Sequence, residues 1–322
     1  MRSVFPAFLL LFGSAGYVEA QAGAAPDAIA WLHKIATASR QVNYAGTFVY
    51  QHGNHTETSR IAHRVNAGGE FERLEILDGP PREIMRNNEN VTCYLPETKT
   101  VVIEKRVARR FPVALPERVS GISDNYVIKK GGQDRVAGYD CQMIALEPRD
   151  NLRYGHKFCV ELKTGLPLRA RTYSDHNEMV ESFAFTQLML GSGVNRDMLR
   201  SRYAGKSQAW RVDKSALEES EANADTGWVL KNQPAGFSKV TEMRRSIAGR
   251  PVSVAHIVYS DGLAAVSVFI EPMPKSPPPA GPTYQGAVNI YVTSHADRMV
   301  TVVGETPART VKQIAESLSF RE

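Results

Sequence analysis

Two neighbouring stretches of alternating apolar and polar residues indicate a β-hairpin near the start of the chain. Residues 44–51 and 56–65 flank Gly53-Asn54, a pair that favours a two-residue hairpin turn. Pairing His52 with His55 sets the register and separates the apolar side chains from the polar ones. The apolar face then holds Tyr44, Phe48, Tyr50, Ile61 and Val65. This pattern predicts a sheet that is covered on one side.

Further short runs of strand-like sequence follow at close intervals. They are residues 71–77, 83–86, 91–95, 99–104, 139–146, 154–162, 169–174 and 179–188. An antiparallel sheet of about ten strands twists and curls. Before it, Asp27 can cap a helix, whose apolar positions recur at helical spacing: Ile29, Leu32, Ile35 and Ala36. We therefore expect an α+β fold in which a large curled antiparallel sheet forms a half-barrel around helical or loop filling, with room for an apolar ligand.

A second, smaller α+β domain is expected after a polar connection. The strand pattern lapses over 191–226, and residues 218–225 are acidic and polar, as in a linker. Beyond it, 253–259 with 264–271 and 287–294 with 298–303 indicate two hairpins. Thr306 as N-cap and Pro307 as first residue predict a final helix, with an apolar stripe at Val311, Ile314, Ala315 and Leu318. The predicted domains span 27–190 and 227–322, joined by a linker over 191–226.

The N-terminus has the pattern of an export signal. Arg2 precedes an apolar run over 4–12, and Val18-Glu19-Ala20 offers a small-x-small cleavage site. The run is much shorter than the roughly 20 residues of a membrane-spanning helix. We expect residues 1–20 to be a cleaved signal peptide.

Export places the cysteines in a compartment where disulfides persist. Residues 139–146 and 154–162 indicate a hairpin, and a pairing centred near Asp150 puts Cys141 opposite Cys159. A cross-strand disulfide can then form, whereas a register one residue away would separate the two thiols. Cys93 alternates with apolar neighbours, which favours a buried, inert thiol.

Composition and motifs exclude several classes of function. The 39 Lys and Arg residues against 34 Asp and Glu residues give a net charge of +5, far from the dense basic field of a nucleic-acid-binding protein. The common metal, phosphate, nucleophile and thiol-redox signatures do not occur. His52, His55 and His63 lack an acidic or cysteine partner at metal-site spacing. We therefore expect neither an enzyme, nor a cofactor, nor a metal site.

Two basic clusters are candidates for contact with an anionic partner. The first, in the stretch 99–118, holds Lys105, Arg106, Arg109 and Arg110, and the second holds Arg244 and Arg245. Arginine forks suit carboxylate and phosphate groups. The alternative interpretation of each cluster is an ordinary solvated loop.

Distinctive strings occur in both halves of the chain. The first half contributes YAGTFVY (44–50), RYGH (153–156), TGLPL (164–168) and FAFTQL (183–188). The second half contributes PAGF (234–237), YSDGL (259–263), SVFIE (267–271) and VTVVGE (300–305). Together they resemble the RseB/MucB family of periplasmic regulators, since they occur in the family's order and cover nearly all of the chain after the signal peptide.

The resemblance implies a non-enzymatic, periplasmic negative regulator of a sigma-E type (AlgU-type) envelope stress response. Such a regulator binds the periplasmic region of a membrane-embedded anti-sigma factor, RseA or MucA, and shields it from site-1 proteolysis. The family's first domain resembles the lipoprotein carriers LolA and LolB, and its apolar cavity implies sensing of lipopolysaccharide or mislocalised lipoprotein acyl chains.

For that cavity we nominate the apolar face of the first hairpin, whose alternative role is that of a plain core. The alternative function is a periplasmic lipid or lipoprotein carrier. No nucleic-acid partner is expected, and assembly into a homo-oligomer stays open.

Overall fold

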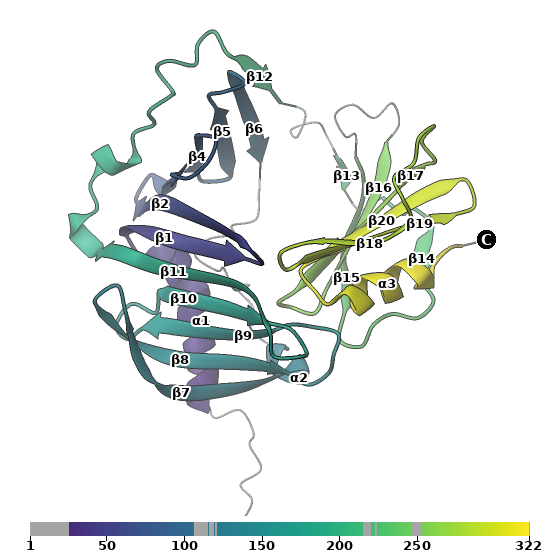
Figure 1. Ribbon diagram of the computed structural model, residues 1–322, viewed down its shortest axis with the longest axis horizontal. Helices are drawn as coiled ribbons and strands as arrows, with labels where there is room; N and C mark the ends of the chain where they lie inside the picture. Colours follow the sequence, from purple (N-terminus) through teal and green to yellow (C-terminus); the bar gives the residue numbers. More distant parts are fainter. Residues whose placement is uncertain are drawn as a thin grey trace, which may run out of the picture.

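The computed structural model describes residues 26–105, 115, 119, 121–214, 220–222, 224–245 and 253–321. These residues form two domains that lie side by side (Figure 1). The predicted signal peptide lies outside the described residues. No helix within these ranges has the length and apolar character needed to cross a membrane.

The first domain is a long curled sheet that holds twelve strands within the described residues, in the order β12-β6-β5-β4-β3-β2-β1-β11-β10-β9-β8-β7. All neighbours are antiparallel except β12 with β6. The strands are β1 (Tyr44–His52), β2 (His55–Asn66), β3 (Gly69–Ile76), β4 (Arg82–Asn87), β5 (Asn90–Leu95), β6 (Thr100–Lys105), β7 (Tyr126–Val136), β8 (Tyr139–Pro148), β9 (Gly155–Glu161), β10 (Pro167–Tyr173), β11 (Met179–Leu190) and β12 (Arg211–Asp213). The predicted curled antiparallel sheet is confirmed.

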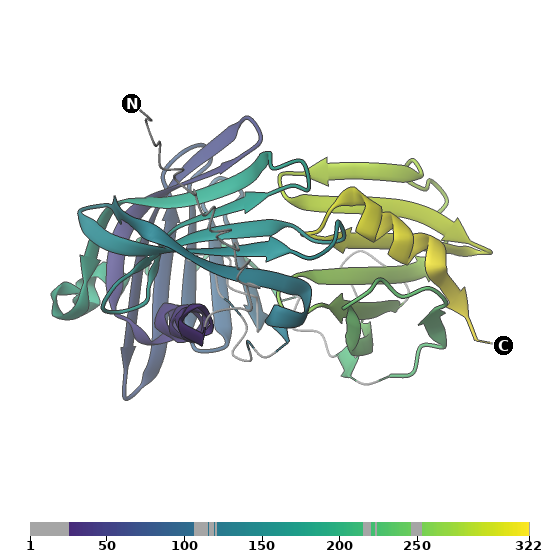
Figure 2. The same cartoon turned by 90° about the horizontal axis from the view of Figure 1, so that it is seen from below.

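Helix α1 (Pro26–Gln41) fills the concave face of this sheet (Figure 2). Its Leu32 and Ile35 are fully buried in one cluster with Tyr44 and Phe48 of β1, because apolar residues at helical spacing meet the apolar face of the strands. Asp27 differs from its predicted role as the cap. It lies inside the first turn, where its carboxylate pairs with Lys130 of β7 at 2.5 Å.

The first hairpin has the predicted register, with His52 opposite His55. Strand β7 and the short helix α2 (Ile122–Asn125) before it were not predicted. The run Lys129-Lys130-Gly131-Gly132 breaks the alternation of β7, and its pairing with β8 shifts between Lys130 and Gln133. Such a bulge removes the period-two signal by which a strand is recognised in a sequence.

The second domain is an antiparallel sheet with seven strands among the described residues, in the order β13-β15-β16-β17-β20-β19-β18. They are β13 (Ser220–Ala222), β15 (Ser238–Arg245), β16 (Val254–Ser260), β17 (Ala265–Pro272), β18 (Gly281–Gln285), β19 (Val288–His295) and β20 (Arg298–Gly304). Both predicted hairpins are confirmed, as β16–β17 and β19–β20. A separate pair joins β14 (Trp228–Leu230) to β21 (Leu318–Phe320).

The last helix, α3 (Ala308–Ser317), packs on the second sheet. Its predicted stripe is buried, although Leu318 already belongs to β21. The helix starts one residue later than predicted, with Pro307 as N-cap and no capping bond from a side chain. The fixed φ of proline suits this position beside the first turn, so Thr306 is left outside the helix.

Residues 191–226 contribute to both sheets and are more than a linker. Two short 3-10 helices, η1 (Gly191–Gly193) and η2 (Arg196–Leu199), are followed by β12, which extends the first sheet beside β6. Strand β13 then pairs with β15 of the second sheet. The described part up to residue 213 therefore belongs to the first domain.

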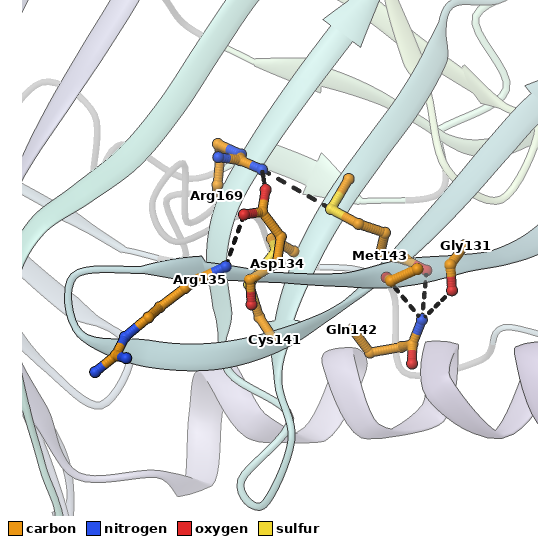
Figure 3. The surroundings of a disulfide bond; sticks show 9 residues. Gly131, Asp134, Arg135, Cys141, Gln142, Met143 and Arg169 are labelled. Carbon is orange, nitrogen blue, oxygen red and sulfur yellow. Dashed lines mark hydrogen bonds and ion pairs between the residues drawn. A yellow bond between two sulfur atoms is a disulfide. The ribbon is translucent and has the colours of Figure 1, made fainter.

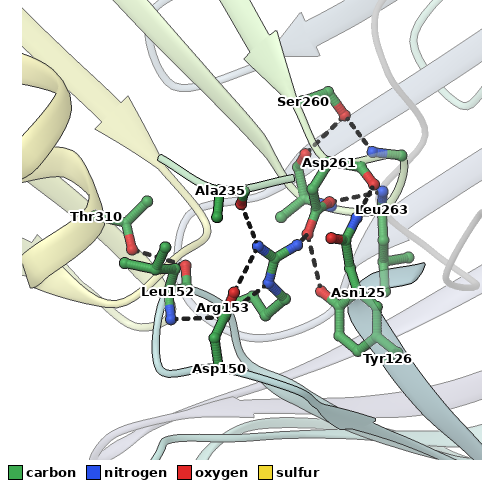
Figure 4. Close-up of polar contacts among 12 residues, drawn as sticks. Asn125, Tyr126, Asp150, Leu152, Arg153, Ala235, Ser260, Asp261, Leu263 and Thr310 are labelled. Atoms are coloured by element: carbon green, nitrogen blue, oxygen red, sulfur yellow. Dashed lines mark hydrogen bonds and ion pairs between the residues drawn. The ribbon is translucent and has the colours of Figure 1, made fainter. Parts of the chain in front are cut away.

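A buried arginine joins the two domains (Figure 4). Arg153, in the loop between β8 and β9, is fully buried, and its Nη1 donates to Oδ2 of Asp261, between β16 and β17, at 2.7 Å. Its Nη2 donates to the carbonyl of Ala235 at 2.6 Å. Asp150 accepts from Nε and Nη2 at 2.9 and 3.0 Å. A buried charge is stable only when it is paired and hydrogen-bonded. Since the partners of Arg153 come from both domains, the two domains must stay in this relative position to satisfy it.

Apolar side chains cross the junction in both directions. Leu152 of the first domain packs against the core of the second domain, and Leu263 of the second domain packs against the core of the first. Nearby, Thr310 Oγ1 donates to the Leu152 carbonyl at 2.7 Å, and Asn289 Nδ2 donates to the Tyr154 hydroxyl at 2.8 Å. The two domains thus share an interior.

Replacing this arginine should destabilise the whole chain. Arg153→Met leaves the Asp261 carboxylate buried without its countercharge, and we expect the free energy of unfolding to fall by about 3–5 kcal/mol, measured by urea denaturation. Arg309→Met is the matched control, since its ion pair with Asp175 also crosses the junction at 2.5 Å but its side chain is 46% exposed. That loss should stay below about 1 kcal/mol. Equal losses would contradict a buried link.

Candidate functional site on the concave face

The cavity candidates nominated from the sequence lie on the concave face, against α1. Tyr44, Phe48, Tyr50 and Ile61 are buried members of the first core, whereas Val65 is half-buried and outside this cluster. The Tyr50 hydroxyl donates to Glu181 of β11 at 2.6 Å. In the described structure, the four buried residues are covered by other side chains of the protein. Their role as ligand contacts stays a prediction.

An apolar row continues from this core across the next strands. The cross-strand pairs of β2 to β6 align Ile61, Leu74, Ile84, Cys93 and Val102. All but the first are half-buried, so the row leaves the packed core and approaches the surface. With strands about 4.8 Å apart, it extends for about 19 Å. Alternation within each strand indicated this face, but it could not show which part stays open.

A buried carboxyl group borders the apolar row. Glu72 of β3 lies beside Arg86 of β4, with 3.9 Å between Oε1 and Nε. Burial raises the pKa of Glu72 to about 7, and the charge of Arg86 opposes this rise in part. Farther along the concave face, burial lowers the pKa of His156 to about 4. Burial disfavours the charged form of both groups.

The pKa of Glu72 predicts a pH-dependent stability. The folded state holds the Glu72 proton more tightly than the unfolded chain does, so this stabilisation is complete below pH 4.5 and is lost as the pH rises through about 7. Between pH 4.5 and about 7, the free energy of unfolding of the wild type should therefore decrease by up to about 3 kcal/mol relative to that of Glu72→Gln. Urea denaturation at a series of pH values measures it, and parallel profiles would contradict the assignment.

The basic candidates are described only in part. Arg244 of β15 is exposed and lies opposite Glu221 of β13. The backbones of Lys105 and Arg245 end strands β6 and β15, but their side chains lie outside the description. Arg106, Arg109 and Arg110 lie outside the described residues altogether. Their contact with an anionic partner stays a prediction.

The three histidines of the first hairpin do not share an open surface. The rings of His52 and His55 lie against each other at the tip in a tilted arrangement, with their centroids 5.0 Å apart. His63 is fully buried, with Nδ1 2.7 Å from the Val42 carbonyl and Nε2 3.0 Å from Glu70. Across the ranges that the structure covers, no group of three or more His, Cys, Asp or Glu side chains is placed to hold a metal ion.

A disulfide bond joins Cys141 of β8 to Cys159 of β9 (Figure 3). The expected register was wrong by two residues, because Cys141 lies opposite Glu161 and Cys159 opposite Met143. The two cysteines still share one face, so the bond is diagonal, with 5.3 Å between the Cα atoms. Its pairing survives a shift of two residues because side chains alternate with a period of two.

Removing this bond should loosen the first domain. It closes a loop with a sequence separation of 18 residues, for which chain entropy predicts a loss of about 3 kcal/mol in the free energy of unfolding. Reducing agent should produce this loss in the wild type and in Cys93→Ala, but not in the double variant Cys141→Ala/Cys159→Ala. Equal sensitivity of all three proteins to reductant would contradict a stabilising bond.

The chain matches two family models in succession, the MucB/RseB N-terminal domain over residues 27–203 and the MucB/RseB C-terminal domain over residues 222–319. It is 33% identical to the sigma factor AlgU regulatory protein MucB of Pseudomonas aeruginosa, with 96% of each chain covered. It is 26% identical to the sigma-E factor regulatory protein RseB of Escherichia coli, with 99% of each chain covered.

The fold agrees with solved structures of MucB. A crystal structure of MucB in complex with MucA(peri) matches with a TM-score of 0.72 and 30% identity, covering 92% of this chain and 100% of that chain. The complex structure of Pseudomonas aeruginosa MucA/MucB matches with a TM-score of 0.71 and 31% identity, covering 92% of this chain and 99% of that one. Both domains and nearly the full length are matched, and the chain therefore belongs to the MucB/RseB family.

Proposed function

We propose that this protein is a periplasmic negative regulator of a sigma-E type envelope stress response. It binds the periplasmic region of a MucA-like or RseA-like anti-sigma factor, shields that region from site-1 proteolysis, and releases it when acyl chains of lipopolysaccharide or mislocalised lipoproteins bind. One observation carries the proposal: both domains match MucB over nearly the full length, and solved MucB structures include complexes with MucA.

The apolar row supports an acyl ligand. Leu74, Ile84, Cys93 and Val102 present a half-buried strip beside the core. An acyl chain laid along it gains about 0.8 kcal/mol for each methylene that it buries. A micromolar protein contact is worth about 8 kcal/mol, so a long chain supplies enough free energy to oppose the anti-sigma factor. The ligand must bind the free protein more tightly than the complex with the anti-sigma factor. A ligand with equal affinity for both would not change the fraction of protein in the complex.

The junction favours a regulator over the alternative, a lipid or lipoprotein carrier. A carrier would need the concave face alone. Here the loop that holds Leu152 and Arg153 is fixed by the second domain through Asp261 and Thr310. The acyl ligand would lie on β3 to β6, at the other end of the same continuous sheet. If its binding changes the curl of the sheet so that β8 and β9 move, the second domain would feel that movement through this loop, which gives the coupling a physical route.

Competition is tested by titrating lipid A into the purified complex with the anti-sigma periplasmic segment, followed by fluorescence anisotropy. We expect saturating lipid A to weaken anti-sigma binding at least tenfold in the wild type. Ile84→Glu, which puts a charge into the apolar row, should abolish this effect and retain anti-sigma binding. Met85→Glu is the matched control on the opposite face of β4 and should behave as the wild type. Unchanged anti-sigma affinity at saturating lipid A would reject the coupling.

The carrier alternative makes a different prediction for envelope extracts. A regulator retained on a column should recover one anti-sigma factor, because its second domain is committed to that partner. A carrier should recover diverse lipoproteins instead. Recovery of lipoproteins without an anti-sigma factor would favour the carrier.

A further inference from the structure

A hollow opens on the outer face of the first sheet, on the side away from α1. Its volume is about 410 Å³, and it lies over β1, β2, β3 and β11 beside η2. Its apolar side chains on the outer face are those of Ala45, Ala62, Met189 and Met198. Gly46, Ile61 and Leu188 also line it, although the register puts them at concave-face positions of their strands. This volume is within the range of about 300–1,000 Å³ of small-ligand sites.

Short side chains in the middle of a cross-strand row create this hollow. The register aligns Met189, Ala45, Ala62 and Arg73 across β11, β1, β2 and β3. The two alanines leave space between the long side chains at either end, and Met198 of η2 adds a further wall. Methionine side chains adapt their shape to an apolar guest, so the hollow suits a flexible tail.

The rim of the hollow carries unbalanced positive charge. Glu75 is shared by Arg60, Arg73 and Arg202 at 3.4, 3.1 and 2.5 Å. Arg73 also binds the buried Glu83 at 2.7 Å. In this group of described side chains, three guanidinium ions thus face two carboxylates. Arg60 makes the longest of these contacts, is 49% exposed, and lines the hollow, so its guanidinium is the one placed to meet another anion.

We propose that this hollow binds a small amphiphilic anion, with its apolar tail between Ala45, Ala62 and Met198 and its carboxylate or phosphate head on Arg60. An arginine fork suits either head group. The site and the apolar row lie on opposite faces of the sheet, because Ala45 and Ala62 alternate with Gly46 and Ile61 along β1 and β2, and Ile61 is the one residue that belongs to both. The site does not depend on the proposed regulatory function.

Calorimetry with the full mature chain tests the head and the tail separately. Decanoate and decyl phosphate offer the two heads on one tail, and 1-decanol offers the tail without charge. We expect at least one of the two anions to bind at least tenfold more tightly than the alcohol, and the stronger anion identifies the head. Arg60→Gln should remove this advantage and leave alcohol binding unchanged. Arg64→Gln, which lies four residues farther along β2 on the same face but outside the lining, should keep it.

Filling the hollow tests its location. Ala45→Leu should abolish binding of all three probes, whereas Ile84→Glu in the apolar row should leave it intact. A second measurement needs no variant: the methyl NMR signals of Met189 and Met198 should shift with decanoate, and that of Met243, on β15 of the second domain, should not. Binding that is lost in Ile84→Glu and kept in Ala45→Leu would overturn the outer site. So would equal affinity for the anions and the alcohol.

Discussion

The buried pair of Arg153 and Asp261 determines how the rest of the molecule is arranged. Desolvating two charges costs several kcal/mol per ion unless each finds its partners, and here those partners come from both domains. Burial also raises the pKa of Tyr126, so its phenol stays protonated and donates to Asp261. Gly236 lies at φ +76°, where a Cβ atom would come within 2.1 Å of the Asn125 side chain. Position 236 therefore favours glycine over any residue that has a Cβ atom.

The two faces of the first sheet carry different chemistry because side chains alternate along each strand. The concave face buries aromatic residues under α1 and then opens into the apolar row. The outer face mixes charged residues such as Arg60 and Glu75 with apolar ones, and its two small alanines leave the hollow. One set of strands can thus offer two unlike surfaces, and a ligand on either surface acts on the same backbone.

The features predictable from the sequence are those fixed by local spacing. The two-residue turn at Gly53-Asn54 fixes the register of β1 and β2, whereas the longer loop between β8 and β9 does not, and the pairing of Cys141 was misplaced there. The apolar row could not be predicted in this way, because recognising it requires knowing which of five strands are neighbours in the sheet. The junction was missed because Arg153 and Asp261 are far apart along the chain. The signal was present, since RYGH, PAGF and YSDGL, three of the strings that carried the resemblance, meet at this junction.

The exchange of Leu152 and Leu263 between the cores has a consequence for the independence of the halves. Each domain contributes one leucine to the core of the other: Leu152 packs in the second core, and Leu263 packs in the first. A chain cut between the domains would expose an apolar pocket and a protruding leucine on each fragment. Asp261 would lose its arginine partner, whereas Arg153 would keep Asp150. The two domains therefore depend on each other for complete cores. Truncations or fusions that separate them would yield aggregation-prone fragments with exposed apolar surface.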